Sequence, residues 1–289
     1  ARIQVEDAKY ADKKGYSSHK PPLALYDEND AAQAIRLMQV VNFRETIQVT
    51  DDISAVFHPS GHILGASFVT VQAADKSLLF SGDMGRPQHP ILVQPDPIPE
   101  GPFDAVLCES TYGDRTHDTP TSEFAKVINE TIHAGGSILI PAFAVDRTEV
   151  ILVKLRELID AQEIPEVPIY ADSPMALSSL EFYRNAIDEH SPEIRQDVAD
   201  EWNHRDPFDP GTLKEMKTVD ESKSLNDVHK PCIIVSASGM ATGGRVVHHL
   251  ARMLPVQKNT VILVGYQALG TRGRQLGDGA EEVKIHGEV

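Results

Sequence analysis

The sequence predicts an α/β protein in two unlike parts: an antiparallel sheet within residues 1–113, and a doubly wound parallel α/β domain over residues 114–289. Two observations support this division. Before residue 114, short apolar runs follow one another with connections too short for crossover helices, which favours antiparallel pairing. After it, apolar runs alternate with helical patterns, which is typical of a parallel sheet covered by helices.

The first part is expected to open with a helix and continue with strands. Asp27 is the predicted N-cap of a helix through Ala31 to Val41, and Asp30 lies in its first turn, where the helix dipole favours a carboxylate. Four successive strands are then expected, in the runs ISAVFH, ASFVTVQ, SLLFSG and AVLCEST.

The second part alternates between helical and strand patterns. The helical segment SEFAKVINETIHA ends at Gly135-Gly136, a common helix stop, and a second helix is expected from Asp146 to about Gln162. A third helix should begin near Gly243. Residues 202–231 are polar and rich in Pro and Gly, so we expect a long surface loop with room for one short element. The expected strands are SILIPAF, VPIYAD, CIIVSAS and TVILVGYQ.

Composition narrows the class of protein. Apolar residues make up 41% of the 289, enough for a substantial core, and no run of 18 apolar residues suggests a membrane span. Cys108 and Cys232 both lie in apolar, strand-like runs, so we expect two buried thiols and a reducing, cytoplasmic location. The formal charge of −16 weighs against a general polyanion-binding surface but permits a local basic groove.

Two residues stand out as metal-ligand candidates, because each lies where a strand meets a loop. His62 sits in a turn bracketed by glycines and Asp83 follows a strand; imidazole and carboxylate groups are good Zn²⁺ ligands, and an aspartate can bridge two ions. On spacing alone, a turn histidine and a capping aspartate are the preferred interpretation, because a histidine and an aspartate at this spacing are common by chance. His58 and the adjacent pair His248 and His249 are weaker candidates, expected behind the ligands or in surface and packing positions.

The sequence motifs around these residues favour the metal-ligand interpretation. GHILGAS, FSGDMGRP and CESTYGDR, followed in order by IPAFAVDRTEVIL, YADSPMA, SASGMATGGRVVHHL and VGYQALGTRGRQL, resemble the β-CASP family of metallo-β-lactamase-fold, RNA-processing nucleases. The resemblance covers nearly the whole chain. It implies that residues 1–113 are part of a metallo-β-lactamase αββα sandwich and residues 114–289 the inserted β-CASP domain.

The resemblance also implies a chemistry. His62 would hold one zinc ion, Asp83 would bridge two, and Glu109 would orient a histidine beside the scissile phosphate. The implied activity is hydrolysis of RNA phosphodiester bonds by a hydroxide that two zinc ions activate. The implied partner is single-stranded RNA, held in a slot between the two domains, with no membrane involved.

A second group of residues is predicted to hold the RNA backbone. In SASGMATGGR a buried strand leads into a helix, and amides at a helix N-terminus flanked by glycines suit a phosphate. An ordinary strand–loop–helix junction would look the same. Asp172 with Ser173, and Asp146 with Arg147, are either site residues or helix caps; for Asp146 capping is the preferred interpretation. The predicted substrate-binding residues are Ser238, Gly243, Gly244, Arg245, Arg272 and Arg274.

The family's main metal motif, H-x-H-x-D-H, does not occur in this sequence. The resemblance places it before residue 1 and a further histidine motif after the end, so KIHGEV at residues 284–289 is interpreted as a strand closing the insert, with His286 as a ligand only a minor alternative. We therefore expect a chain incomplete at both ends that binds zinc weakly and is inactive alone. The alternatives are a non-catalytic RNA-binding or scaffold protein, a homo-oligomer or complementing chain that supplies the missing ligands, and a hydrolase of small esters.

Overall fold

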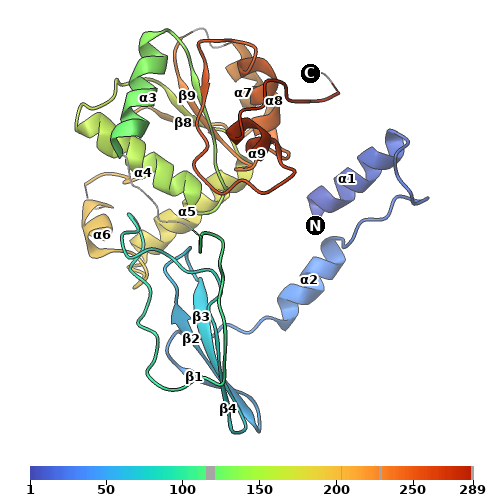
Figure 1. The fold of residues 1–289 in the computed structure, drawn as a ribbon, viewed down its shortest axis with the longest axis vertical. Coiled ribbons are helices and arrows are strands. Elements are labelled where there is room, and N and C mark those ends of the chain that lie inside the picture. The colour runs from blue at the N-terminus through green and yellow to red at the C-terminus, as the bar shows by residue number, and fades with distance from the viewer. Residues whose placement is uncertain (115–120, 203, 228–229, 288–289) are drawn as a thin grey trace.

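The first sheet has five strands in the order β1-β2-β3-β4-β5, in a computed structural model that describes residues 1–114, 121–202, 204–227 and 230–287 (Figure 1). Strands β1 to β4 pair antiparallel, whereas β5 lies parallel to β4. The four predicted strands are thus present, and β1 is an addition that the sequence did not indicate. The bounds are β1 Thr46–Thr50, β2 Ile53–Pro59, β3 Ser67–Ala73, β4 Lys76–Phe80 and β5 Ala105–Leu107.

The second sheet also has five strands, in the order β10-β6-β9-β7-β8. All its pairings are parallel, which confirms the class of sheet predicted for this part. The non-sequential order means that the chain crosses over between strands through helices. The bounds are β6 Ile138–Pro141, β7 Ile169–Ala171, β8 Leu213–Glu215, β9 Ile233–Ser236 and β10 Thr260–Val261.

Helices cover both faces of the second sheet, as a doubly wound domain requires. Successive residues of a strand point to opposite faces, so Ile138 and Ile140 of β6 enter one core cluster while Leu139 enters another. The first cluster packs beneath α3 (Thr121–His133), α4 (Arg147–Asp160) and α5 (Pro174–Asp188), and the second beneath α8 (Arg245–Met253).

The two sheets are tied together by a short segment that follows β4. The Val93 amide donates to the Glu193 carbonyl oxygen, and the Arg195 amide donates to the Ile91 carbonyl oxygen, both at 2.9 Å. Ile91 and Leu92 are buried within the core cluster beneath α4 and α5. This segment therefore anchors the first sheet on the insert domain, just before α6 (Gln196–Trp202).

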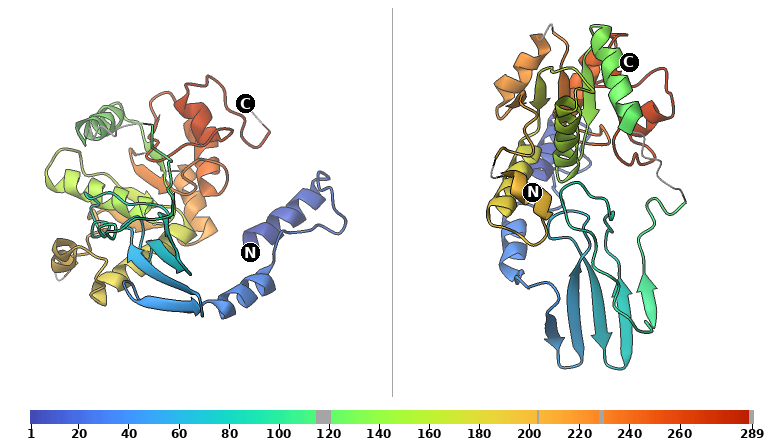
Figure 2. Two further views of the ribbon diagram at one scale, coloured as in Figure 1. Left: turned by 60° about the horizontal axis from the view of Figure 1, so that its bottom comes forward. Right: turned by 90° about the vertical axis from the view of Figure 1, so that its left-hand side faces the viewer.

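The N-terminal segment extends away from the body, as Figure 1 and the left view of Figure 2 show. It contains α1 (Arg2–Lys13), which the sequence did not indicate, and α2 (Glu28–Leu37). Asp27 caps α2 through a capping box with Asp30, as predicted, but the helix ends at Leu37 and not at Val41. Within the described residues the first part of the chain forms one sheet layer, so the αββα sandwich stays a prediction.

Other expectations for the fold need correction. The polar stretch 202–231 contains three elements, because β8 extends the sheet and α7 (Val219–Ser224) continues into a 3₁₀ turn, η1 (Leu225–Asp227). Cys232 is buried, but Cys108 is exposed because it follows the edge strand β5. The described part of KIHGEV, residues 284–287, contains no named strand. No helix in the described ranges is long and apolar enough to cross a membrane.

Candidate active site between the two sheets

The loop that carries His62 joins β2 to β3 and is closed by its own backbone. The Ser60 amide donates to the Ala66 carbonyl oxygen at 2.9 Å, and the Ala66 amide donates to that of Ile63 at 3.0 Å. Gly61 has a φ of +63°, and a β-carbon there would lie 2.7 Å from the Val93 carbonyl oxygen. Only glycine fits this position without a shift, because the anchoring segment crosses directly behind the loop.

The turn that carries Asp83 packs against this loop, backbone to backbone. The Ser60 hydroxyl donates to the Asp83 carbonyl oxygen, and the Gly85 amide donates to the Ser60 carbonyl oxygen, each at 2.8 Å. A β-carbon on Gly85 would lie 2.0 Å from the Gly61 carbonyl oxygen. The structure therefore brings the His62 loop and the Asp83 turn together, as the predicted site requires.

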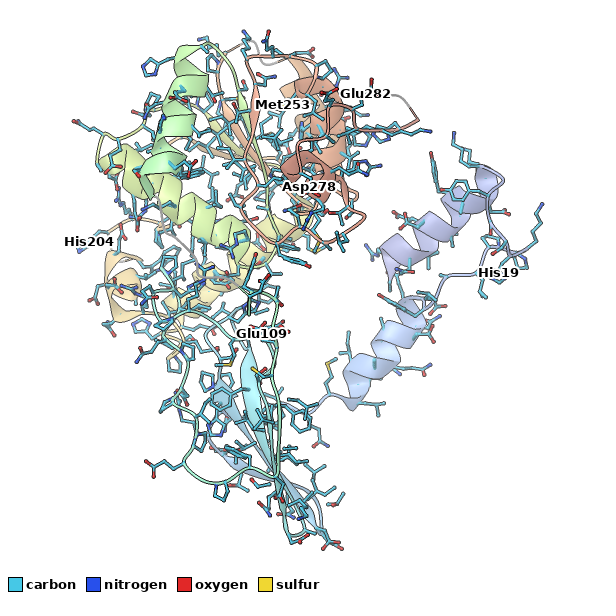
Figure 3. The ribbon with its side chains drawn as sticks, in the orientation of Figure 1. His19, Glu109, His204, Met253, Asp278 and Glu282 are labelled. Atoms are coloured by element: carbon cyan, nitrogen blue, oxygen red, sulfur yellow. The ribbon has the colours of Figure 1, made fainter. Side chains whose placement is uncertain are left out.

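Glu109 joins the same place from the end of β5, where Figure 3 labels it at the junction of the two parts. Its amide donates to the Ser81 hydroxyl at 2.8 Å, and its side chain accepts the Thr111 amide at 3.0 Å. The Thr111 amide holds the pKa of Glu109 below its ordinary value, and the Met84 amide and nearby His62 act in the same direction. Glu109 is thus a carboxylate beside the two metal-ligand candidates.

The loop between β9 and α8 contains three of the predicted phosphate-binding residues. The Ser238 hydroxyl accepts the Thr242 amide at 3.2 Å, which closes the loop on itself. Gly243 and Gly244 are exposed, and Gly244 adopts a φ of +79° immediately before α8 begins. The loop therefore presents backbone to solvent at the carboxyl end of a buried parallel strand, where ligands bind in open α/β sheets.

Arg245, in contrast, is engaged inside the protein. It donates to the Asp172 carboxylate at 2.7 Å and to the Met216 carbonyl oxygen at 2.8 Å. Asp172 is fully buried and also accepts Ser222 and His249, each at 2.6 Å. Burial alone would raise the pKa of Asp172, but the hydrogen bonds from His249, Ser222 and Arg245 hold it below its ordinary value. The Arg245 guanidinium is thus already bound to groups of the protein, and its contact with a phosphate stays a prediction.

Arg272 and Arg274 also have protein partners. Arg272 donates to the carbonyl oxygens of Lys284, Ala241 and Thr242, and so ties the last described residues to the β9–α8 loop. Arg274, in α9 (Arg272–Gly277), pairs with Asp278 one turn later at 2.8 Å on the surface. Their contact with RNA likewise stays a prediction.

Comparison with known proteins points to one family. Residues 148–276 match the family model described as the Beta-Casp domain. Ribonuclease TTHA0252 of Thermus thermophilus is 34% identical over 266 residues, which are 91% of this chain and 60% of that protein. The chain belongs to the β-CASP family. An RNase J-like protein of Methanocaldococcus jannaschii is 35% identical over 90% of this chain and 60% of its own length. The transcription termination factor FttA of Thermococcus kodakarensis is 32% identical over 91% and 41%.

This β-CASP chain spans about 60% of the length of the first two relatives. Among the residues that the structure describes, no three His, Cys, Asp or Glu side chains cluster so that they could hold a metal ion. Zinc takes four ligands, at least three of them from protein in its usual sites. His62 and Asp83 have the right donor atoms but are too few.

A buried polar network behind the His62 loop was missed by sequence reasoning. Asp146 precedes α4, but its side chain makes no capping bond, so the capping interpretation was wrong. Its carboxylate accepts the Tyr183 hydroxyl at 2.9 Å and lies 3.3 Å from His89 Nε2. Because His89 Nδ1 accepts the amides of Ile91 and Leu92, its proton is on Nε2 and is donated to Asp146.

This network reaches the site through two consecutive amides of the His62 loop. The Leu64 amide donates to the Tyr183 hydroxyl oxygen at 3.4 Å, and the Gly65 amide donates to the Glu193 carboxylate at 2.9 Å. Burial raises the pKa of Glu193. Side chains of the β-CASP domain thus hold the loop that carries His62. No local sequence pattern predicts these hydrogen bonds, because Tyr183 and Leu64, for example, are 119 positions apart.

The remaining histidine candidates lie outside the centre of the site. His58 stacks on Phe68 across the first sheet, with ring centroids 4.7 Å apart. His249 is buried against Asp172, whereas His248 stacks on His286 at 4.6 Å. These are packing and surface positions, as expected.

Proposed function

We propose that this chain forms part of a metal-dependent ribonuclease that hydrolyses phosphodiester bonds of single-stranded RNA. The observation that supports this most is that the His62 loop, the Asp83 turn and Glu109 meet at one place, beside the carboxyl ends of the second sheet. That edge is where open α/β sheets bind ligands. The names of the relatives, ribonuclease TTHA0252 and RNase J-like protein, point to the same substrate class.

The metal of the complete centre is proposed to be zinc, with His62 and Asp83 as the ligands that this chain contributes. Glu109 is ionised at neutral pH and is proposed to hold a proton donor beside the scissile phosphate. Two ligands bind a metal weakly, so we expect the chain by itself to be inactive or nearly so. A cytoplasmic location stays a prediction, and an oligomer or complementing chain finds no support in the relatives or in the described residues.

Two assays on the purified chain test this proposal. In the first, fluorescence anisotropy compares a labelled single-stranded RNA with the same strand in a duplex. We expect the single strand to bind more tightly and its affinity to fall as salt rises. Equal binding of the duplex would overturn the single-strand assignment. Hydrolysis of a chromogenic ester, with no RNA binding, would favour the small-ester alternative.

In the second assay, the labelled RNA is incubated with the chain and millimolar Mn²⁺ or Zn²⁺. We expect at most trace cleavage, and the trace should disappear in Asp83→Asn. Full turnover at substoichiometric zinc would overturn the expected inactivity. Cleavage that Asp83→Asn leaves unchanged would overturn the role given to Asp83, while tight RNA binding with no cleavage at any metal concentration would favour a non-catalytic RNA-binding protein.

A further inference from the structure

Three aromatic residues gather beside Glu109 at the carboxyl edge of the second sheet. Phe143 follows β6 and Tyr266 follows β10, and these two strands are parallel neighbours, so the two residues leave the same edge of the sheet. Tyr112 lies three residues after Glu109, in the same turn. Its ring meets the Tyr266 ring edge to face, with centroids 5.9 Å apart and planes at 84°. The contact joins the Glu109 turn to the β-CASP domain.

The Phe143 ring lies close to the backbone at two glycines. A β-carbon on Gly239 would lie 2.9 Å from Phe143 Cδ2, and one on Gly265 would lie 3.2 Å from Cε2. Two glycines therefore give the ring room to lie against the chain. Phe143 is 37% exposed and Tyr266 is 42% exposed, so both rings still present surface to solvent. Exposed aromatic rings that lie close together often mark a binding surface.

These rings connect the two groups of residues that the sequence singled out. Gly239, under the Phe143 ring, directly follows Ser238 of the β9–α8 loop, and Gly265 directly precedes Tyr266. Tyr266 contacts the Glu109 turn through Tyr112, and Phe143 lies against Gly239 of the β9–α8 loop, so the surface formed by these two rings touches both groups. A polynucleotide strand whose scissile phosphate lies at Glu109 would cross this surface on its way to that loop.

We propose that Phe143 and Tyr266, braced by Tyr112, form a stacking platform for unpaired nucleobases, which rests on the proposed function and adds how the strand is held. Bases of single strands stack on aromatic rings with little regard to sequence, whereas bases in a duplex are already stacked on each other. A platform of this kind suits a chain of net charge −16, in which general attraction to phosphate is weak. Such a platform favours single strands over duplex without any base-specific hydrogen bond.

The test compares an oligouridine of about 12 nucleotides with an abasic strand of the same length, by anisotropy. Phe143→Leu and Tyr266→Leu remove the rings and keep apolar volume, and Tyr266→Phe keeps the ring without its hydroxyl. Phe182→Leu is the matched control, because Phe182 is 71% exposed on α5. We expect the wild-type chain to bind oligouridine at least about tenfold more tightly than the abasic strand.

Each ring deletion should weaken oligouridine binding roughly fivefold or more and leave abasic binding unchanged, with Tyr266→Phe and Phe182→Leu close to wild type. Equal wild-type binding of both strands would overturn the platform while leaving RNA binding intact. Equal weakening of both strands by the Leu variants would also overturn it, because that is the signature of a structural role. Binding of neither strand would overturn the platform and the proposed function together.

Discussion

A substitution of Arg245 distinguishes a structural role for this residue from the RNA-binding role that its position in SASGMATGGR predicted. Arg245→Met keeps most of the stem and removes the guanidinium that binds the fully buried Asp172. Removing one partner of a buried ion pair costs about 3–5 kcal/mol. The Arg245 side chain is 17% exposed and Asp172 keeps Ser222 and His249, so we expect the lower end, about 3 kcal/mol. In a domain of this size that lowers Tm by roughly 6–12 °C.

Thermal unfolding followed by circular dichroism measures this, alongside anisotropy with single-stranded RNA. Arg274→Met is the control, because its pair with Asp278 is on the surface and contributes at most about 1 kcal/mol. Adding Asp172→Asn to Arg245→Met should recover part of the loss, since it removes the orphaned charge. If Arg245→Met leaves Tm unchanged and weakens RNA binding tenfold, the structural reasoning is refuted and Arg245 binds phosphate.

Three further predictions concern buried side chains and one crowded glycine. Glu149 is fully buried, and burial raises the pKa of its carboxyl group from 4.5 to about 7, against the smaller lowering effect of the Ser179 hydroxyl and of nearby backbone amides. The folded protein then holds the proton that the unfolded chain has lost, so stability should fall by roughly 3 kcal/mol as pH rises from 4.5 to 7. Glu149→Gln should abolish that fall in denaturant titrations; an unchanged pH profile would contradict it. Tyr183→Phe should lower the free energy of unfolding by about 1–3 kcal/mol and speed hydrogen exchange of the Leu64 amide. Unaltered exchange would disprove the hydrogen bond between this amide and the Tyr183 hydroxyl. Gly85→Ala should lower the free energy of unfolding by at least about 2 kcal/mol, because its β-carbon would collide with the Gly61 carbonyl oxygen. Gly113→Ala would make only ordinary contacts and should be tolerated. Equal Tm values for the two variants would show that Gly85 is not crowded.

Local signals predicted the elements, and long-range contacts decided the roles of several polar residues. The Asp27 cap could be predicted because its partner is three residues away. The parallel sheet followed from apolar runs separated by helical patterns. Asp146 could not be assigned from sequence, since its partners Tyr183 and His89 are 37 and 57 positions away. The pairing of Arg245 with Asp172 could not be predicted for the same reason, because it spans 73 positions.

The candidate site, too, was predictable from sequence only in part. The placement of His62, Asp83 and Glu109 at one junction agrees with the family pattern, and the backbone contacts between their turns explain the glycines around them. The proposed aromatic platform was not predicted, because Phe143 and Tyr266 follow strands that are adjacent only in the folded sheet. Exposure of such rings is a property of the assembled edge and cannot be inferred from strand patterns alone.

The most direct test is whether Mn²⁺ binds beside His62 and Asp83. NMR spectra of the chain labelled with ¹⁵N-glycine, recorded with and without Mn²⁺, locate the ion. Paramagnetic broadening reports which amides lie near the ion. The account predicts that Gly61, Gly82 and Gly85 broaden first, that remote Gly211 and Gly279 stay sharp, and that Asp83→Asn abolishes the selective effect. First broadening at Gly211 or Gly279, or a pattern that Asp83→Asn leaves unchanged, would contradict the placement of the catalytic centre.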